Sequence, residues 1–125
     1  MTARFLGTAL LLFAPSLAGC GRAPGENLAA RGEALAREKG CASCHSSDGS
    51  PSVGPTWKGL YRSKVELSDG STVLAGQAYL RESMLAPSAK TVKGFPEGLM
   101  ETVIKPNSLS DEEVGALLAY IEPLR

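Results

Sequence analysis

Apolar residues recur at helical spacing near the end of the chain and predict an amphipathic helix there. The apolar positions lie three or four residues apart: Val114, Leu117, Leu118 and Ile121. The tetrapeptide Ser110-Asp111-Glu112-Glu113, directly before them, has the form of a capping box, in which a serine and a glutamate cap the first turn reciprocally. A helix is therefore predicted to begin after Ser110 and to run to about Glu122.

A second helix is predicted near residue 30. Asn27 can cap it, and it runs to about Lys39, where Gly40 ends it. The small residues Gly32 and Ala36 lie near one of its faces.

The middle of the chain alternates between short elements and loops. Val65 to Leu74 predicts a short hairpin that turns at Asp69-Gly70, and Gly76 to Leu85 predicts a helix. Lys90 to Pro106 is irregular and contains several Gly and Pro residues. The pattern as a whole predicts a small all-α domain with a short hairpin insertion.

Length, charge and the histidine count exclude some classes of function. The chain has 125 residues, with 13 basic and 13 acidic side chains, which is one domain's worth of polypeptide with no charge excess. We therefore expect no nucleic-acid partner. We also expect the protein to be a monomer. His45 is the single histidine, so any zinc site or His-dependent catalytic triad would have to be built around it.

The first 19 residues resemble a secretory signal peptide. Arg4 supplies a positive charge, and Phe5 to Leu17 form a largely apolar run that is shorter than the about 20 residues of a spanning helix. The run ends at Leu17-Ala18-Gly19-Cys20, which resembles the lipobox of bacterial lipoproteins, where the cysteine receives a diacylglyceryl group and becomes the new N-terminus. Ordinary cleavage, with Cys20 incidental, is the alternative.

This leader predicts the organisation of the chain. Residues 1–19 form the lipoprotein signal peptide, residues 20–26 a tether from the lipidated Cys20, and residues 27–125 the folded domain. The protein is then an exported bacterial lipoprotein, anchored to a membrane and facing the periplasm or the outside.

The two remaining cysteines lie in Cys41-Ala42-Ser43-Cys44-His45, the attachment motif of c-type haem. Each thiol adds to one haem vinyl group, and the imidazole then lies under the iron as the proximal ligand. A zinc site would need Cys20, which is predicted to carry lipid. A thioredoxin-like dithiol usually follows a strand, whereas the flanks here are helical and then rich in Gly, Ser and Pro. The motif predicts one covalently attached haem c.

The sixth iron position decides between an electron carrier and a reactive site. Met84 and Met100 are the candidates, since Met1 is removed with the signal peptide. Met84 lies in a predicted helix, where a methionine is more often core filler. Met100 lies in a Gly/Pro-rich loop that can arch over a flat cofactor, so Met100 is the predicted ligand, with Met84 or an open site as alternatives.

Six segments occur in order along most of the chain after Leu28: Cys41-x-x-Cys44-His45, Gly54-Pro55-Thr56-Trp57-Lys58-Gly59-Leu60-Tyr61, Val65-Glu66-Leu67-Ser68-Asp69-Gly70-Ser71, Tyr79-Leu80-Arg81-Glu82-Ser83, Val92-Lys93-Gly94-Phe95-Pro96 with Met100, and Leu117-Leu118-Ala119-Tyr120-Ile121. The set resembles class I cytochromes c and, within them, the cytochrome c domain fused to subunit II of caa3-type haem-copper oxidases.

The resemblance implies the roles of the site residues. It implies His45 and Met100 as axial ligands, with the Pro55 carbonyl accepting the His45 ring N–H, a bond that fixes the ring and makes it a better donor. Trp57 offers an indole N–H that suits a haem propionate, unless it is a core aromatic.

The resemblance also implies the class I cytochrome c fold, in which the first and last helices cross around one haem, with Gly32 and Ala36 against Leu117 and Tyr120. Two features depart from the oxidase pattern. A lipoprotein-like signal replaces the copper-site and membrane segments that precede this domain in oxidases, and Met84 replaces an expected aliphatic residue.

These features together predict a membrane-tethered one-electron carrier rather than an enzyme. The expected donor is a quinol-oxidising complex and the expected acceptor a terminal oxidase, such as a haem-copper oxidase, in the same membrane. A cytochrome c subunit bound to a larger respiratory complex is the main alternative. A haem sensor or peroxidase with an open sixth site is the other.

Overall fold

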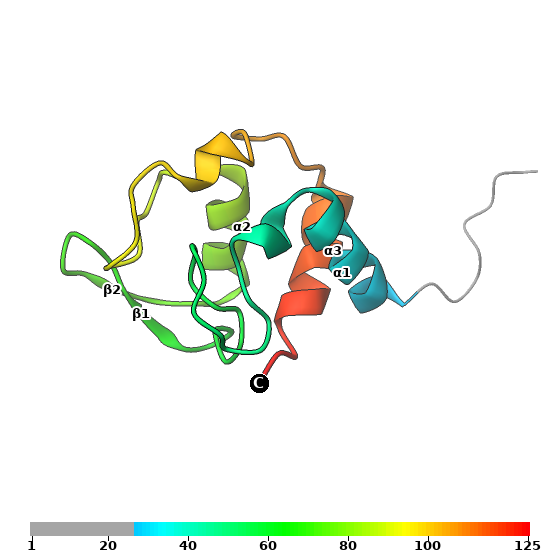
Figure 1. Cartoon of the computed structure of the whole chain (residues 1–125), viewed down its shortest axis with the longest axis horizontal. Coiled ribbons are helices and arrows are strands. Elements are labelled where there is room, and N and C mark those ends of the chain that lie inside the picture. Colours follow the sequence, from blue (N-terminus) through cyan, green and yellow to red (C-terminus); the bar gives the residue numbers. More distant parts are fainter. Residues whose placement is uncertain (1–26) are drawn as a thin grey trace, which may run out of the picture.

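The first and last helices of the described chain pack against each other. In the computed structural model, which describes residues 27–125, helix α1 covers Leu28–Glu38 and helix α3 covers Asp111–Ile121. Figure 1 shows these two helices together, next to helix α2 (Gln77–Leu85), with the strands farther away. The predicted signal peptide, the lipidated Cys20 and the tether lie outside the described residues.

Both helices begin where the sequence predicts, because each has a local cap. The Asn27 side chain accepts a hydrogen bond from the Ala29 N–H at 3.0 Å. The Ser110 hydroxyl accepts from the Glu113 N–H at 3.2 Å, and the Glu113 carboxylate accepts from the Ser110 N–H at 2.9 Å. These caps supply partners to N–H groups that have none within the helix. The predicted capping box is confirmed.

A glycine allows α1 and α3 to approach closely. A Cβ atom on Gly32 would overlap the backbone carbonyl of Ala116 and would lie 2.8 Å from Cβ of Tyr120. Ala36 and Leu117, each 1% exposed, belong to the same buried cluster at this contact. The predicted contact between the first and last helices is therefore present, and it depends on the missing side chain at position 32.

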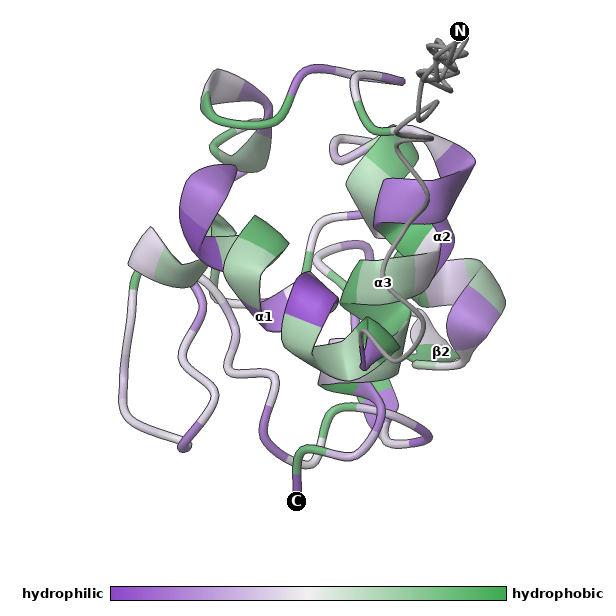
Figure 2. Ribbon diagram, turned by 90° about the vertical axis from the view of Figure 1, so that its right-hand side faces the viewer, coloured by the Kyte–Doolittle hydropathy of each residue, from purple (hydrophilic) through white to green (hydrophobic). Residues whose placement is uncertain are grey.

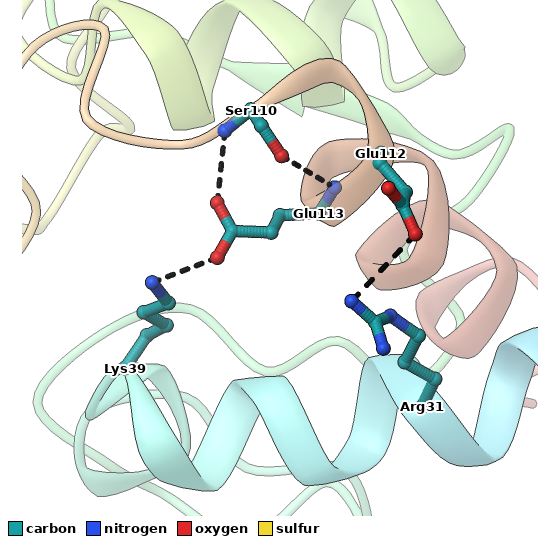
Figure 3. A network of polar contacts seen from close by, with 5 residues as sticks. All are labelled: Arg31, Lys39, Ser110, Glu112 and Glu113. Carbon is teal, nitrogen blue, oxygen red and sulfur yellow. Dashed lines mark hydrogen bonds and ion pairs between the residues drawn. The ribbon is translucent and has the colours of Figure 1, made fainter. Parts of the chain in front are cut away.

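Two ion pairs, drawn in Figure 3 together with the Ser110 cap, join the same two helices. Lys39 Nζ lies 2.8 Å from the Glu113 carboxylate, and Arg31 Nη2 lies 3.7 Å from the Glu112 carboxylate. The hydrogen bond from Lys39 lowers the pKa of Glu113 below its ordinary value, and the Ser110 N–H adds to this shift. One carboxylate thus caps α3 and holds the end of α1.

The predicted hairpin is present, with a slightly longer turn. Strand β1 (Lys64–Glu66) pairs antiparallel with strand β2 (Thr72–Leu74). The turn uses three residues, 68–70, because the Asp69 carboxylate accepts hydrogen bonds from the Ser71 N–H at 2.9 Å and from its hydroxyl at 2.6 Å. Three-residue turns with a left-handed glycine at the end are common in hairpins.

Buried apolar residues from all three helices form the main core. The largest fully buried side chains all come from α3: Val114, Leu117 and Ile121. Figure 2 shows hydrophobic stretches beside hydrophilic ones on the helices, as expected of amphipathic helices around a core. Residues 27–125 are mostly helical, with three α-helices and one small sheet. Among residues 27–125, none of the helices has the length and apolarity needed to cross a bilayer.

Candidate functional site

A left-handed glycine turns the chain from α1 into the cysteine motif. Gly40 has φ +78°, a conformation that glycine adopts without strain, and the 3-10 helix η1 (Cys41–Ser43) follows it. The N–H groups of Cys44 and His45 both donate to the Cys41 carbonyl, at 3.1 and 3.0 Å. This tight turn places both thiols and the imidazole along the wall of one cavity.

The His45 imidazole is oriented by a backbone carbonyl. Its Nδ1 donates a hydrogen bond to the Pro55 carbonyl oxygen at 2.7 Å. Burial lowers the pKa of His45 below its ordinary value, and the hydrogen bond to Pro55 opposes this shift only in part. With the proton on Nδ1, the lone pair lies on Nε2, which is therefore the nitrogen available to a metal ion.

The chain after the motif folds back onto it. The Gly54 N–H donates to the Cys44 carbonyl at 2.7 Å, and the Trp57 N–H donates to the Ser46 carbonyl at 2.8 Å. A Cβ atom on Gly54 would lie 2.8 Å from Cε1 of His45 and 3.0 Å from Nδ1. The His45 ring thus occupies the space beside Gly54, and a larger residue there would displace the ring.

The motif faces an apolar cavity of about 480 Å³. A cavity of this size is in the range of small-molecule and cofactor sites. Its walls include apolar side chains from β1, α2, α3 and two loops: Leu60, Val65, Leu80, Phe95, Leu117 and Ile121. All six residues predicted to bind the cofactor line it: Cys41, Cys44, His45, Pro55, Trp57 and Met100.

Cys41 and Cys44 are not joined in a disulfide, and their thiols differ in environment. Burial raises the pKa of the Cys41 thiol above its ordinary value. Cys44 lies 3.9 Å from the Ser43 hydroxyl, measured from sulfur to oxygen. Both thiols are therefore available for covalent attachment to a group in the cavity.

Both methionines considered as ligands line this cavity. Met84, on α2, is 7% exposed and belongs to the main core cluster. Met100 begins the 3-10 helix η2 (Met100–Thr102), and its carbonyl accepts the Ile104 N–H at 2.9 Å. Met100 is outside the buried core cluster and lies in the predicted loop. It stays the predicted ligand for that reason.

Two contacts at this site were not predicted from the sequence. The Trp57 ring stacks on the His45 ring, with centroids 5.1 Å apart and planes within 10°. Gly54 provides the space for the same imidazole. Both contacts come from the segment Gly54-Pro55-Thr56-Trp57. From the sequence, a contact with His45 was predicted only for Pro55 in this segment.

Comparison with known proteins identifies the family of the domain. A family model described as Cytochrome c matches residues 29–125. The match covers the cysteine motif, both methionines and α2 and α3. No curated protein matches the chain.

Proposed function

The chain belongs to the cytochrome c family, and on that premise we propose that it is a one-electron carrier whose haem iron is ligated by His45 and Met100. Membership of this family gives the cofactor, because cytochromes c bind covalently attached haem c with iron. It also implies haem-based electron transfer. The observation that carries the proposal is that the cysteines, His45 and Met100 all line one apolar cavity.

The residues around the cavity fit this group. Two cysteines separated by two residues can each form a thioether to the same edge of a porphyrin. Nε2 of His45 carries the free lone pair, because Nδ1 is occupied by the Pro55 carbonyl at 2.7 Å. The mostly apolar wall suits the flat macrocycle.

When bound, haem c supplies a one-electron Fe(III)/Fe(II) couple, which a His/Met ligand pair holds at a relatively high potential. His45 contributes a nitrogen whose tautomer Pro55 fixes, and Met100 contributes a thioether. The apolar side chains exclude water and lower the local dielectric. This disfavours the additional positive charge of the oxidised state.

We further propose that the domain is tethered to a membrane through Cys20 and resembles the cytochrome c domain of caa3-type oxidases. The support is the lipobox-like sequence Leu17-Ala18-Gly19-Cys20 and the ordered motifs from Cys41 to Ile121. A tether of residues 20–26 reaches at most about 25 Å. Its partners are therefore membrane complexes in the same plane: a quinol-oxidising donor and a haem-copper oxidase as acceptor.

The tether is tested with Cys20→Ala, expressed in a strain that matures cytochromes c. We expect the variant to carry haem like the wild type but to appear in the soluble fraction, and quinol-dependent respiration to fall. A Cys20→Ala protein that stays in the membrane fraction and supports full respiration contradicts the tether.

The carrier function is tested with purified holoprotein. We expect a chemical reductant to deliver one electron per haem and a purified haem-copper oxidase to remove it. The reduced protein should not bind carbon monoxide, because Met100 fills the sixth position. Rapid carbon monoxide binding would instead indicate the sensor or peroxidase alternative. Co-purification in fixed ratio with a respiratory complex would indicate a bound subunit.

A further inference from the structure

We propose that Trp57 is a positioning residue for the His45 imidazole, fixing the plane of the ring and closing the apolar cavity against a polar pocket that both residues also line. This inference rests on the proposed function, in which His45 is an iron ligand. Trp57 is 7% exposed, and its ring stacks on that of His45 with centroids 5.1 Å apart and planes within 10°. This is an offset-stacked geometry.

The stack supplies a constraint that the hydrogen bond to Pro55 lacks. A single bond at Nδ1, 2.7 Å long, fixes one atom of the imidazole but leaves the ring free to tilt about that atom. A parallel aromatic face resists such tilting, because tilting brings ring atoms into contact on one side and opens a gap on the other. Trp57 therefore determines the plane of the ring, whereas Pro55 determines its tautomer.

Trp57 is itself held in place from two directions. The backbone N–H of Trp57 donates to the carbonyl of Ser46, the residue after His45, at 2.8 Å, so the Trp57 backbone is bonded next to the motif while its ring stacks on His45. Its indole also meets the Tyr120 ring edge to face, with centroids 5.9 Å apart and planes at 85°. Tyr120 belongs to α3 and lies at the contact with Gly32. The orientation of the imidazole is thereby tied to the packing of α1 on α3.

The same indole lies between two cavities of opposite character. Besides the apolar cavity, His45 and Trp57 line a polar pocket of about 350 Å³, whose other walls include Ser46, Asp48 and Arg37. Of the described residues, His45 and Trp57 alone line both cavities. Removing the indole would join the polar pocket to the apolar cavity next to the imidazole. Water admitted there would raise the local dielectric and favour the oxidised, more highly charged state.

The test compares three holoproteins with the wild type. Trp57→Leu removes the aromatic face, Trp57→Phe retains one, and Leu118→Ala removes a buried side chain that lines neither cavity. Two measurements are made: the midpoint potential, and the electron paramagnetic resonance spectrum of the oxidised state, whose anisotropy responds to the imidazole plane.

We expect Trp57→Leu to shift the redox equilibrium about tenfold toward the oxidised form, which is about 59 mV for a one-electron couple, and to alter the spectrum. Trp57→Phe should stay close to the wild type in both measurements. Leu118→Ala should unfold more easily while its potential and spectrum are unchanged. If Trp57→Leu does not accumulate with haem, Trp57→Met places a longer, flexible apolar side chain there without a ring, and the same changes in potential and spectrum are expected.

The inference is overturned if the variant without the ring keeps the wild-type potential and spectrum, or if Leu118→Ala shifts them equally. In either case Trp57 is only a packing residue. A wild-type protein without a low-spin His/Met spectrum would instead overturn the proposed function, so the two failures are distinguishable.

Discussion

Substituting alanine for Gly32 tests the packing of the first and last helices. A Cβ atom at this position would overlap the backbone carbonyl of Ala116 and lie 2.8 Å from Cβ of Tyr120. Neither atom can rotate away, since one belongs to the backbone of α3 and the other is fixed to it. α1 must therefore move as a unit, and its contacts with the core loosen along its length.

Two opposing free energies decide the outcome. Alanine is favoured over glycine in a helix interior by about 0.8–1 kcal/mol, so an uncrowded substitution stabilises. Overpacking of a filled contact costs about 1–3 kcal/mol, and the overlap with rigid atoms places Gly32→Ala at the upper part of this range. We expect a net destabilisation of about 1–2 kcal/mol, which lowers the Tm by about 4–8 °C for each kcal/mol in a domain of this size.

Gly115 supplies the matched control. It lies in α3, and a Cβ atom built on it meets nothing within 4 Å. Gly115→Ala should therefore stabilise the protein by up to about 1 kcal/mol. The assay is equilibrium unfolding of each holoprotein followed by far-ultraviolet circular dichroism. If Gly32→Ala is as stable as Gly115→Ala, the close approach of the two helices is refuted.

Three further predictions concern the caps and the imidazole. Ser110→Ala removes a helix cap and should cost about 1 kcal/mol in the same unfolding assay, whereas no change would mean that the capping box contributes nothing. The hydrogen bond from Lys39 lowers the pKa of Glu113, so its contribution to stability is present above the ordinary carboxyl pKa and is lost as the pH falls through the lowered value. Wild-type stability should consequently fall more steeply on acidification than that of Glu113→Gln, and equal slopes would contradict this assignment. Gly54→Ala crowds the His45 ring, since the added Cβ would lie 2.8 Å from Cε1, and should lower the low-spin fraction of the oxidised haem spectrum; an unchanged spectrum would show that the ring tolerates the methyl group.

Local signals account for what the sequence predicted well. The starts of α1 and α3 follow from Asn27 and from the Ser110–Glu113 capping box, whose partners are two or three residues away. The spacing of the cysteines and His45 likewise requires only one tight turn to bring them to one wall. Such short-range contacts can be predicted from the identities of neighbouring residues.

Contacts between distant segments were harder to predict. The stack of Trp57 on His45 depends on a loop that folds back through hydrogen bonds between backbone groups. Side-chain identities do not predict such backbone bonds. The extra residue in the hairpin turn is a local miss: the Asp69 side chain bonds to Ser71, two residues on, which the Asp69-Gly70 dipeptide alone did not predict. Met84 and Met100 both line the cavity, because α2 and the later loop meet there. The structure distinguishes the two methionines by burial, since Met84 belongs to the buried core and Met100 does not.

The central claim is that His45 and Met100 ligate the iron of a one-electron carrier, and the oxidised spectrum tests it most directly. A Met-ligated ferric haem shows a sulfur-to-iron charge-transfer band. The wild type and Met84→Leu should both show this band, and Met100→Ala should lose it. Survival of the band in Met100→Ala, or its loss in Met84→Leu, would contradict the assignment of Met100 as the ligand.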